Sequence, residues 1–289
     1  MSKHIAIVVL ACASPPYDKM LDAIRTTWGA VEVPGVEVFY VYGKPHDDQA
    51  EAVLARAMGL DKVPRVEPGE VYRKGRVILA GCADLKQDQE DCLLRKRLIA
   101  FEHLLLDDKI DLIYTVCATS YIDQSQLIAA TAGLRSNNLF YGPLGVFPDS
   151  GTPWISGASM LLSRDLVQRL VDDSATIIKQ NQFGWRDDVT LGHWIATQYS
   201  GVPLSELVAG YDRRSVSDPE QVFFGAWHQS EDFVITPREN HQPRSGVYHY
   251  HFHSHRPGDL VHFHSLCTAP SEAGNQGTHT KSKASKSSA

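Results

Sequence analysis

The sequence predicts an α/β fold in which a single domain holds a mostly parallel central sheet flanked by helices. Apolar runs of strand length alternate with amphipathic helical patterns through the first half of the chain. This alternation is typical of parallel sheets, whose strands are joined by crossover helices. The strands are nearly continuous apolar runs, which indicates that both of their faces are covered. In sheets of this kind, ligands bind at the carboxyl ends of the strands.

The spacing of apolar residues places each element of the first half. The elements expected are a strand over 5–10, a helix over 17–28, a strand over 36–42, a helix over 93–106 and a strand over 111–116. The first run, with Lys3 before it and Ala11-Cys12-Ala13 after it, also imitates a short signal peptide. Because its basic region is so small, we interpret it as a buried strand that ends before Ser14-Pro15-Pro16.

The second half is less regular, and its elements are placed by caps and by alternation. The elements expected are a strand over 154–162, a helix over 166–170 capped by Ser163-Arg164-Asp165, a helix over 187–199 and an alternating strand over 247–254. From Ala269 onward the chain has almost no apolar residue, so we expect residues 269–289 to form a flexible tail. The folded domain is therefore expected over residues 1–268.

The composition argues against several classes of function. Lys and Arg number 28 against 34 Asp and Glu, which gives a net charge of −6. Nucleic-acid binding favours a net basic face, so we expect no nucleic-acid partner. The five cysteines are widely spaced without a CxxC, which favours a reducing compartment over a disulfide scaffold. No apolar run approaches the length of a membrane-spanning helix, so we expect a soluble protein with no membrane span.

Four segments in a fixed order carry the most specific signal. Ile24-Arg25-Thr26-Thr27-Trp28-Gly29 follows the first strand, and Asp88 and Lys96 stand eight residues apart at the head of the long helix. Residues 155–166 read ISGASMLLSRDL, and residues 186–192 read RDDVTLG. Together the four resemble the β-1,3-galactosyltransferase and Fringe-like glycosyltransferases. Members of that family show R-x-T-W, D-x-Y-x-N-L-T-x-K, a small-residue strand ending in S-x-x-L or S-R-D, and E/D-D-V-x-x-G.

The resemblance covers about residues 5 to 200 and implies a GT-A, Rossmann-like fold. It implies an inverting enzyme that moves a sugar from a nucleotide-diphosphate sugar, with a UDP-sugar as the expected donor and a glycan hydroxyl as the acceptor. The nucleotide-sugar half is expected over about residues 1–125 and the acceptor half over about residues 126–268. Eukaryotic relatives usually carry a membrane anchor, whereas this sequence starts at the first strand, so we expect a cytoplasmic bacterial or viral enzyme.

The sequence departs from this family after the third strand. Where the family has D-x-D before an aromatic and a small apolar residue, this chain has Cys117-Ala118-Thr119 before Ser120, Tyr121 and Ile122. A divalent ion on a diphosphate prefers carboxylate ligands, which this stretch lacks. Three alternatives remain: protein cations neutralise the diphosphate, the protein is inactive, or Mn²⁺ or Mg²⁺ is held by residues elsewhere. We favour the first and so expect no metal ligands here.

The donor contacts expected on this basis are cations and the polar residues at matching positions of the strands. The candidate cations are Arg25, Lys74, Arg95 and Lys96, and the further candidate donor contacts are Ser14, Thr119, Ser120 and Tyr121. A solvated helix face is the simpler interpretation of Arg95.

The resemblance assigns the catalytic role to an acidic pair. Inversion requires that the acceptor hydroxyl lose a proton as it attacks, and a carboxylate is the usual base. Asp188 is the expected base because it precedes Val189 as in the family, and Asp187 is expected to support it or to cap the following helix.

The expected acceptor contacts are small and aromatic residues close to this pair. Gly157 and Ala158 lie where the family brings its backbone near the sugars, with tight strand packing as the alternative. Trp154 and Trp185 are expected to stack on an acceptor sugar, although a core position is the commoner fate of a residue such as Trp154.

Histidines alternate near the end of the chain. His249, His251, His253 and His255 are expected on one face of a strand, opposite Tyr248, Tyr250 and Phe252, and His262 and His264 repeat the spacing. Such a strand can bind a transition metal, or it can be an edge strand whose histidines face solvent. We favour solvated histidines for most of them and keep His253 and His255 as candidate phosphate or metal contacts.

Three functions therefore compete. The first is a metal-independent inverting glycosyltransferase, the second is a non-catalytic GT-A-fold protein that binds a glycan or a partner, and the third is a metal-dependent hydrolase built on the histidines. The Asp187-Asp188 pair favours the first over the second. The absence of H-E-x-x-H weakens the third.

Overall fold

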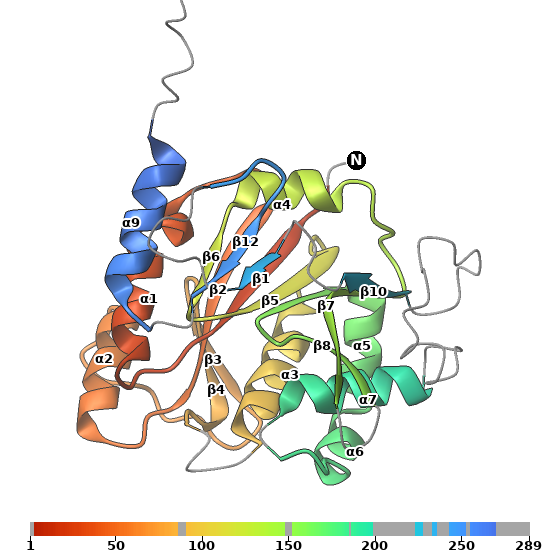
Figure 1. Cartoon of the computed structure of the whole chain (residues 1–289). Coiled ribbons are helices and arrows are strands. Elements are labelled where there is room, and N and C mark those ends of the chain that lie inside the picture. Colours follow the sequence, from red (N-terminus) through yellow and green to blue (C-terminus); the bar gives the residue numbers. More distant parts are fainter. Residues whose placement is uncertain are drawn as a thin grey trace, which may run out of the picture.

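The computed structural model describes residues 3–85, 91–147, 152–184, 186–198, 223–227, 233–235, 243–252 and 255–269 (Figure 1). The described strands are β1 Ile5–Leu10, β2 Val36–Lys44, β3 Val71–Lys74, β4 Val77–Ala83, β5 Leu112–Cys117, β6 Ser120–Ile122, β7 Leu139–Phe147, β8 Thr152–Ile155, β9 Ser159–Ser163, β10 Phe223–Trp227, β11 Phe233–Ile235 and β12 His249–His251. The described helices are α1 Tyr17–Thr26, the 3₁₀ turn η1 Trp28–Ala30, α2 Asp48–Met58, α3 Cys92–Leu104, α4 Gln124–Thr131, α5 Arg164–Asp172, α6 Ser174–Lys179, α7 Asp187–Gln198 and α9 Pro257–Thr268.

Nine of the described strands form one large mixed sheet in the order β10-β7-β9-β5-β1-β2-β4-β3, with β8 paired to β7. At its centre, β1 runs parallel to both β2 and β5, and β2 runs parallel to β4. Strands β3, β8 and β9 run antiparallel to their neighbours. A smaller sheet joins β11, β12 and β6. The predicted α/β fold with a mostly parallel central sheet is therefore confirmed.

Helices cover both faces of the large sheet, which explains the apolar character of β1. Ile7 belongs to a core that includes residues of α1, α2, α4 and α9, whereas Val8 belongs to a second core that includes residues of α3, α5, α6 and α7. Figure 1 shows α1, α2 and α9 on one side of the sheet and α3, α5 and α7 on the other. Because successive side chains of a strand point to opposite faces, a strand between two helical layers is apolar throughout.

Two predicted elements differ from the structure for local reasons. The helix expected over 17–28 ends at Thr26, and Trp28 starts a 3₁₀ turn instead. The buried Trp28 ring donates to the Ser120 carbonyl at 2.8 Å, so a distant contact fixes this end of the helix. The strand expected over 154–162 is two strands, β8 and β9, separated by a turn in which the Ser159 amide donates to the Ser156 carbonyl.

A buried carboxylate ties together the carboxyl ends of the central strands. Asp84 follows β4, and its side chain accepts hydrogen bonds from the Ala13 amide at 2.8 Å and the Gly43 amide at 2.7 Å. The Lys96 ammonium of α3 lies 3.0 Å from the same carboxylate. One side chain therefore fixes the ends of β1, β2 and β4 against α3, at the edge where ligands bind in such sheets.

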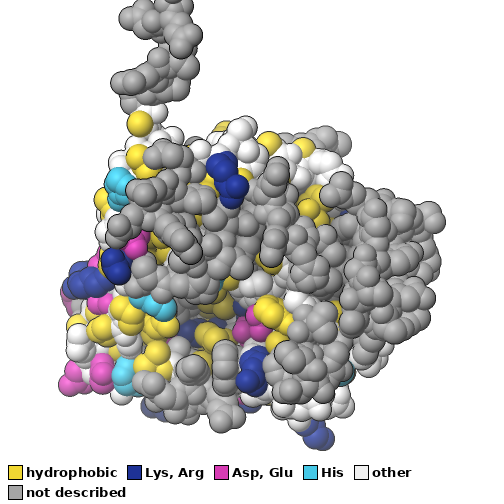
Figure 2. Space-filling view, in the orientation of Figure 1, with side chains coloured by type: hydrophobic (Ala, Val, Ile, Leu, Met, Phe, Trp, Pro, Cys, Tyr) yellow, Lys and Arg dark blue, Asp and Glu magenta, His cyan; other side chains and the backbone are white. Residues whose placement is uncertain are grey.

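The described surface carries both signs of charge. In Figure 2, the Lys, Arg, Asp and Glu side chains that the structure describes are scattered among hydrophobic and neutral ones on the face shown. No helix of the described residues is both long enough and apolar enough to cross a bilayer. The expected tail lies outside the described residues from position 270 onward.

Candidate functional site

The acidic pair opens α7 and is held from two directions. The Asp188 Oδ2 atom accepts a hydrogen bond from the Gly157 amide at 2.9 Å, and its Oδ1 atom accepts one from the Val189 amide at 2.9 Å. Gly157 belongs to the turn between β8 and β9. The Asp188 carboxyl is thus fixed by one backbone N–H on each oxygen while the residue stays half-buried. The helix predicted from position 187 is confirmed.

A buried arginine lies behind the pair. The Arg97 guanidinium of α3 is 1 % exposed, and its Nη2 atom lies 2.8 Å from Asp187 Oδ2. Its Nη1 atom donates to Thr115 Oγ1 at 2.7 Å and contacts the Met160 sulfur at 3.2 Å. This side chain therefore connects α3, β5, β9 and the first turn of α7.

Arg97 was not among the candidate cations, although the sequence holds a signal for it. Position 97 is three residues after Leu94 and four before Phe101, both of which lie on the apolar stripe of α3. Side chains at these spacings share one helix face. An arginine on a buried stripe needs a partner of opposite charge, and that requirement points to a buried acid elsewhere in the chain.

Burial and the neighbouring charge change the acidity of Asp188. Burial and the Asp187 carboxylate raise the pKa of Asp188 to about 6, while the Gly157 N–H, Arg97 and the Val189 N–H oppose the rise. Desolvation and a like charge both disfavour the ionised form of a carboxyl. The result is a carboxylate that is ionised at neutral pH and that binds a proton more readily than an ordinary aspartate.

A side chain at Gly157 would crowd this cluster. A Cβ atom at this position would lie 3.2 Å from Arg97 Nη2 and 3.3 Å from Asp188 Oδ2. The small residue therefore lets the turn after β8 donate its amide to Asp188. Ala158, the second small residue expected at an acceptor, is buried beside it with 5 % exposure.

Trp154 packs against glycines instead of standing free for a sugar. A Cβ atom at Gly145 would lie 2.5 Å from the Trp154 ring, and one at Gly192 would lie 2.6 Å from the Trp154 Cα. The indole is half-buried between β7 and α7, and its Nε1 atom is a buried donor without a hydrogen-bond partner. This placement fits the core alternative better than stacking on an acceptor.

The segment in place of D-x-D, Cys117-Ala118-Thr119, holds a thiol and a hydroxyl, and the Ser120 hydroxyl follows it. Burial raises the pKa of the Cys117 thiol to about 12, although Arg97 favours the thiolate. Thr119 Oγ1 lies 2.8 Å from His251 Nε2, and Ser120 Oγ lies 2.9 Å from His249 Nε2. The hydroxyls of Thr119 and Ser120 are thus shared with the histidine strand.

Histidines from the end of the chain pair with successive residues of this segment. The Tyr121 hydroxyl lies 3.0 Å from His264 Nδ1, which extends the pairing to α9. His249 Nδ1 also lies 2.5 Å from the Tyr114 hydroxyl, and that hydroxyl lies 2.7 Å from Ser159 Oγ. The contact between β6 and β12 is therefore a ladder of side-chain hydrogen bonds beside the backbone ladder.

The expectation that these histidines face solvent is wrong for His249. Its side chain is completely buried, and burial together with His251 lowers its pKa well below the usual value. The strand is only three residues long and pairs with a strand on each side, so it is not an edge strand. His264 lies on helix α9, because the alternation of residues 247–254 does not continue that far.

The predicted donor cations differ in their surroundings. Lys96 is 1 % exposed and donates to the carbonyls of Ala11 and Asp84, both at 2.8 Å, besides its pair with the Asp84 carboxylate. An ammonium has three N–H donors, and these contacts use all of them. A direct contact between Lys96 and a donor does not fit this placement.

The other predicted donor contacts lie at the surface or near it. Arg25 donates to the Tyr42 hydroxyl at 2.5 Å and stacks on the Tyr40 ring. Lys74 donates to the Gly59 carbonyl at 2.7 Å. Arg95 pairs with Asp91 at 2.8 Å and its side chain is 35 % exposed, which agrees with the simpler interpretation of that residue.

Ser14 and His255 lie on the side of the sheet edge that faces α1. Ser14 is buried just beyond β1, with its hydroxyl 3.5 Å from His46 Nδ1. His255 is exposed, and its ring lies edge-on to Tyr17 with centroids 5.6 Å apart. Asp88, Trp185 and His253 lie outside the described residues.

The residues of the described segment do not fit a hard divalent ion. Within the described ranges, no group of three or more His, Cys, Asp and Glu side chains is arranged to hold a metal. The position of the family's D-x-D offers a thiol and a hydroxyl bonded to histidine, whereas Mg²⁺ and Mn²⁺ prefer carboxylate and other oxygen ligands.

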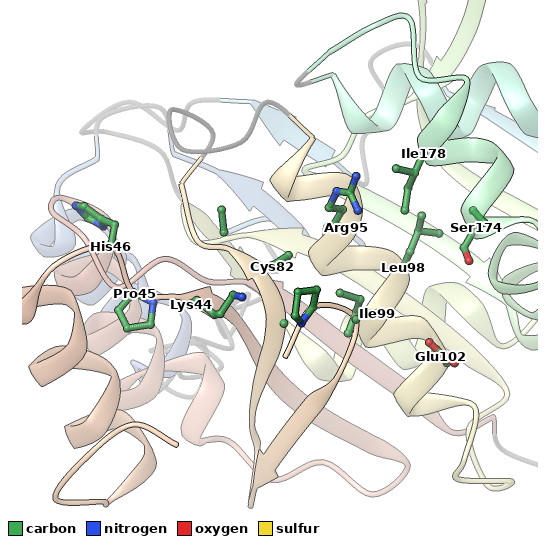
Figure 3. A pocket seen from close by; sticks show the side chains of 15 residues that line it. Lys44, Pro45, His46, Cys82, Arg95, Leu98, Ile99, Glu102, Ser174 and Ile178 are labelled. Atoms are coloured by element: carbon green, nitrogen blue, oxygen red, sulfur yellow. The ribbon is translucent and has the colours of Figure 1, made fainter. Parts of the chain in front are cut away.

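A separate hollow lies on the other face of α3 (Figure 3). It has a volume of about 840 Å³ and is lined by Lys44, Pro45, His46, Pro68, Gly69, Gly81, Cys82, Ala83, Arg95, Leu98, Ile99, Glu102, Ser174, Ala175 and Ile178. Positions 95, 98, 99 and 102 share one side of the helix, and Arg97 points the opposite way at 3.6 residues per turn. The hollow is thus not part of the acidic cluster.

Comparisons with known proteins do not identify a family for this chain. No family model matches the sequence, and no curated protein matches it. Among solved structures, a glycosyltransferase involved in glycosylation of the major capsid of PBCV-1 is 10 % identical over 91 % of this chain and 99 % of that one, with a TM-score of 0.41. The galactosyltransferase LgtC, solved with donor and acceptor sugar analogues, is 9 % identical over 93 % of this chain and 98 % of that one, with a TM-score of 0.44. These scores are too low to support a function, which must rest on the chain's own residues.

Proposed function

We propose that this chain is an inverting glycosyltransferase with a GT-A fold that moves a sugar from a UDP-sugar to a glycan hydroxyl. The observation that carries the proposal is the Asp188 carboxyl, which is half-buried, is held by the Gly157 N–H and has a pKa raised to about 6. A general base works best when its pKa lies near the operating pH. The four segments that resemble the family include this residue and this glycine.

In the proposed step, the acceptor oxygen attacks the anomeric carbon on the face opposite the nucleotide. The bond between that carbon and the diphosphate oxygen breaks, and its electron pair leaves with the diphosphate. The hydroxyl proton passes to Asp188. Each oxygen of this carboxylate accepts one backbone N–H, and a carboxylate oxygen has a further lone pair for the incoming hydroxyl.

The donor is proposed to lie at the carboxyl ends of β1 and β5. Ser14 follows the first of these strands and Cys117 ends the second, and the two strands pair in parallel. Crevices at such strand ends are where α/β sheets bind their ligands. With neutral side chains at Cys117-Ala118-Thr119, we propose that protein cations, not a metal, balance the diphosphate charge.

A second function has one observation in its favour. The Thr119 hydroxyl is already bonded to His251, and no carboxylate takes the place of the D-x-D acids at residues 117–119. A protein that kept the fold but lost turnover would bind a glycan or a partner without releasing UDP. The two functions differ in whether Asp188 has a catalytic task.

The test compares Asp188→Asn with wild type and with Asp172→Asn, a change at an exposed acid of α5. UDP release is measured with UDP-sugars and a panel of glycan acceptors, and UDP affinity is measured by calorimetry with and without Mn²⁺. We expect Asp188→Asn to lower turnover by roughly two to four orders of magnitude with unchanged UDP affinity. Near-wild-type turnover in this variant would remove Asp188 from the mechanism. UDP binding without any turnover in the wild type would favour the binding protein.

A further inference from the structure

The acidic pair has an internal counter-charge. Arg97 lies on α3, one residue after the lysine that the family resemblance singled out, and it reaches the Asp187 carboxylate at 2.8 Å. The guanidinium is 1 % exposed, so a bound substrate does not touch it. Its effect on a reaction therefore passes through the residues that it holds.

The two carboxyl groups of the pair have different surroundings. Asp187 is paired with the guanidinium, whereas the Asp188 oxygens accept backbone amides and the residue is half-buried. An isolated buried charge is costly, and a charge next to a buried guanidinium is much less so. The guanidinium thus stabilises a negative charge at Asp187, while burial and that neighbouring charge favour the protonated form of Asp188.

The guanidinium and the two carboxyl groups are packed closely together. Thr115 Oγ1 and the Met160 sulfur fix the other end of the guanidinium, and a Cβ atom at Gly157 would lie 3.2 Å from its Nη2 atom. The same glycine amide holds Asp188 Oδ2 at 2.9 Å. The turn between β8 and β9 therefore lies against both Arg97 and Asp188.

We propose that Arg97 is a positioning residue that fixes the charge on Asp187 and so leaves Asp188 as the group that takes the acceptor proton. This inference rests on the proposed function for its catalytic meaning, but the division of charge within the pair is a property of the protein alone. Among the residues that the structure describes, the charged and titratable groups that face Asp188 are Asp187 on α7, Arg97 on α3 and Cys117 on β5.

The first experiment needs no activity. Carboxyl carbon signals of the full-length protein are followed by NMR from pH 4 to 9, and the Asp188 signal is identified by its loss in Asp188→Asn. Removing the guanidinium in Arg97→Met leaves two neighbouring carboxylates without their cation. We therefore expect the titration midpoint of Asp188 to rise by about one pH unit. Arg97→Lys keeps the charge and is expected to restore most of the wild-type midpoint.

The matched control is Arg164→Met. Arg164 donates to the carbonyls of Leu105, Asp107 and Ile110 and pairs with the exposed Asp108, so its loss also costs contacts but involves neither acid of the pair. The titration midpoint of Asp188 in Arg164→Met is expected to match that in the wild type. An unchanged midpoint in folded Arg97→Met would overturn the proposal.

The second experiment tests the coupling between Asp187 and Asp188 with an Asp187 variant and with the pH dependence of the transfer rate. Should Arg97→Met fail to fold, Asp187→Asn serves instead, because it removes the negative charge next to Asp188. The titration midpoint of Asp188 should then fall to lower pH. An unchanged Asp188 midpoint in Asp187→Asn also overturns the proposal. In the transfer assay, the acidic limb of the pH–rate profile should shift to higher pH in Arg97→Met. The rate should therefore fall about fivefold at pH 6 and change little at pH 9. A rate reduced equally at every pH would indicate a structural role only. If no transfer is found in any variant while the midpoint still moves, the proposed function fails and the charge division stands.

Discussion

Asp84 and Lys96 form a buried ion pair 3.0 Å long, with side chains 0 % and 1 % exposed. The carboxylate also accepts the amides of Ala13 and Gly43, and the ammonium also donates to the carbonyl of Ala11. The two residues thus close the carboxyl ends of β1, β2 and β4 against α3. Lys96 was expected to contact the donor, but its contacts in the fold are those of a structural residue.

The first prediction concerns the stability that depends on this pair. Asp84→Ala leaves a buried ammonium and two buried amides without their acceptor, so we expect a loss of about 3–5 kcal/mol in the free energy of unfolding. The comparison is Asp108→Ala, whose side chain is 99 % exposed and pairs with the partly exposed Arg164, with an expected loss below about 1 kcal/mol. Urea titrations give both values. A loss in Asp84→Ala no larger than in Asp108→Ala would contradict the structural role.

The second prediction concerns pH and His249. This imidazole is buried and its pKa is lowered well below the usual value, so the unfolded chain binds more protons than the folded one below about pH 6.5. Stability is therefore present above that pH and falls as the pH drops, by up to about 1.4 kcal/mol per pH unit for one proton.

His249→Gln should flatten this dependence, because the variant has no ring to protonate at that position. The measurement is the free energy of unfolding at pH 8, 6.5 and 5.5, taken as the difference between variant and wild type. His262→Gln, at an exposed position of α9, is the control and should keep the wild-type slope. Equal slopes in all three proteins would mean that His249 is not the responsible group.

Local sequence patterns predicted the central strands but not the long-range polar contacts that surround them. The apolar runs of β1, β2 and β5 and the amphipathic pattern of α3 identified the α/β fold, because burial on two faces leaves a direct trace in composition. Alternation alone did not identify the burial of His249, because its partners Tyr114 and Ser120 are more than a hundred residues away. Long-range polar contacts leave no periodic signal.

The residues of the candidate site were likewise predicted only in part. Motif order pointed to Asp188 and Gly157, and the structure brings these two residues into contact. Arg97 was not among the predicted site residues, because the acid that accounts for its burial lies ninety residues later in the chain. The roles of these residues in transfer remain predictions.

The third prediction concerns metal dependence. Since residues 117–119 offer no carboxylate, we expect sugar transfer to continue in EDTA at a rate within about twofold of that with Mn²⁺. Calorimetry with UDP should likewise give the same affinity with and without the ion. A strict requirement for Mn²⁺ or Mg²⁺ would show that residues other than 117–119 hold it, with the histidine strand as the first place to look.

The last prediction concerns Gly157. In Gly157→Ala the new methyl would lie 3.2 Å from Arg97 Nη2 and 3.3 Å from Asp188 Oδ2, closer than side chains normally approach, so these groups must shift by a few tenths of an ångström. A shift of that size at a general base should lower turnover by about tenfold, since positioning errors of 1 Å cost about a hundredfold. Gly133→Ala is the matched control, because nothing lies within 4 Å of its new methyl. UDP affinity should be unchanged in both variants, because the methyl acts on the acidic pair and not on the donor. Equal turnover in the two variants would show that the contact between Gly157 and Asp188 has no part in catalysis.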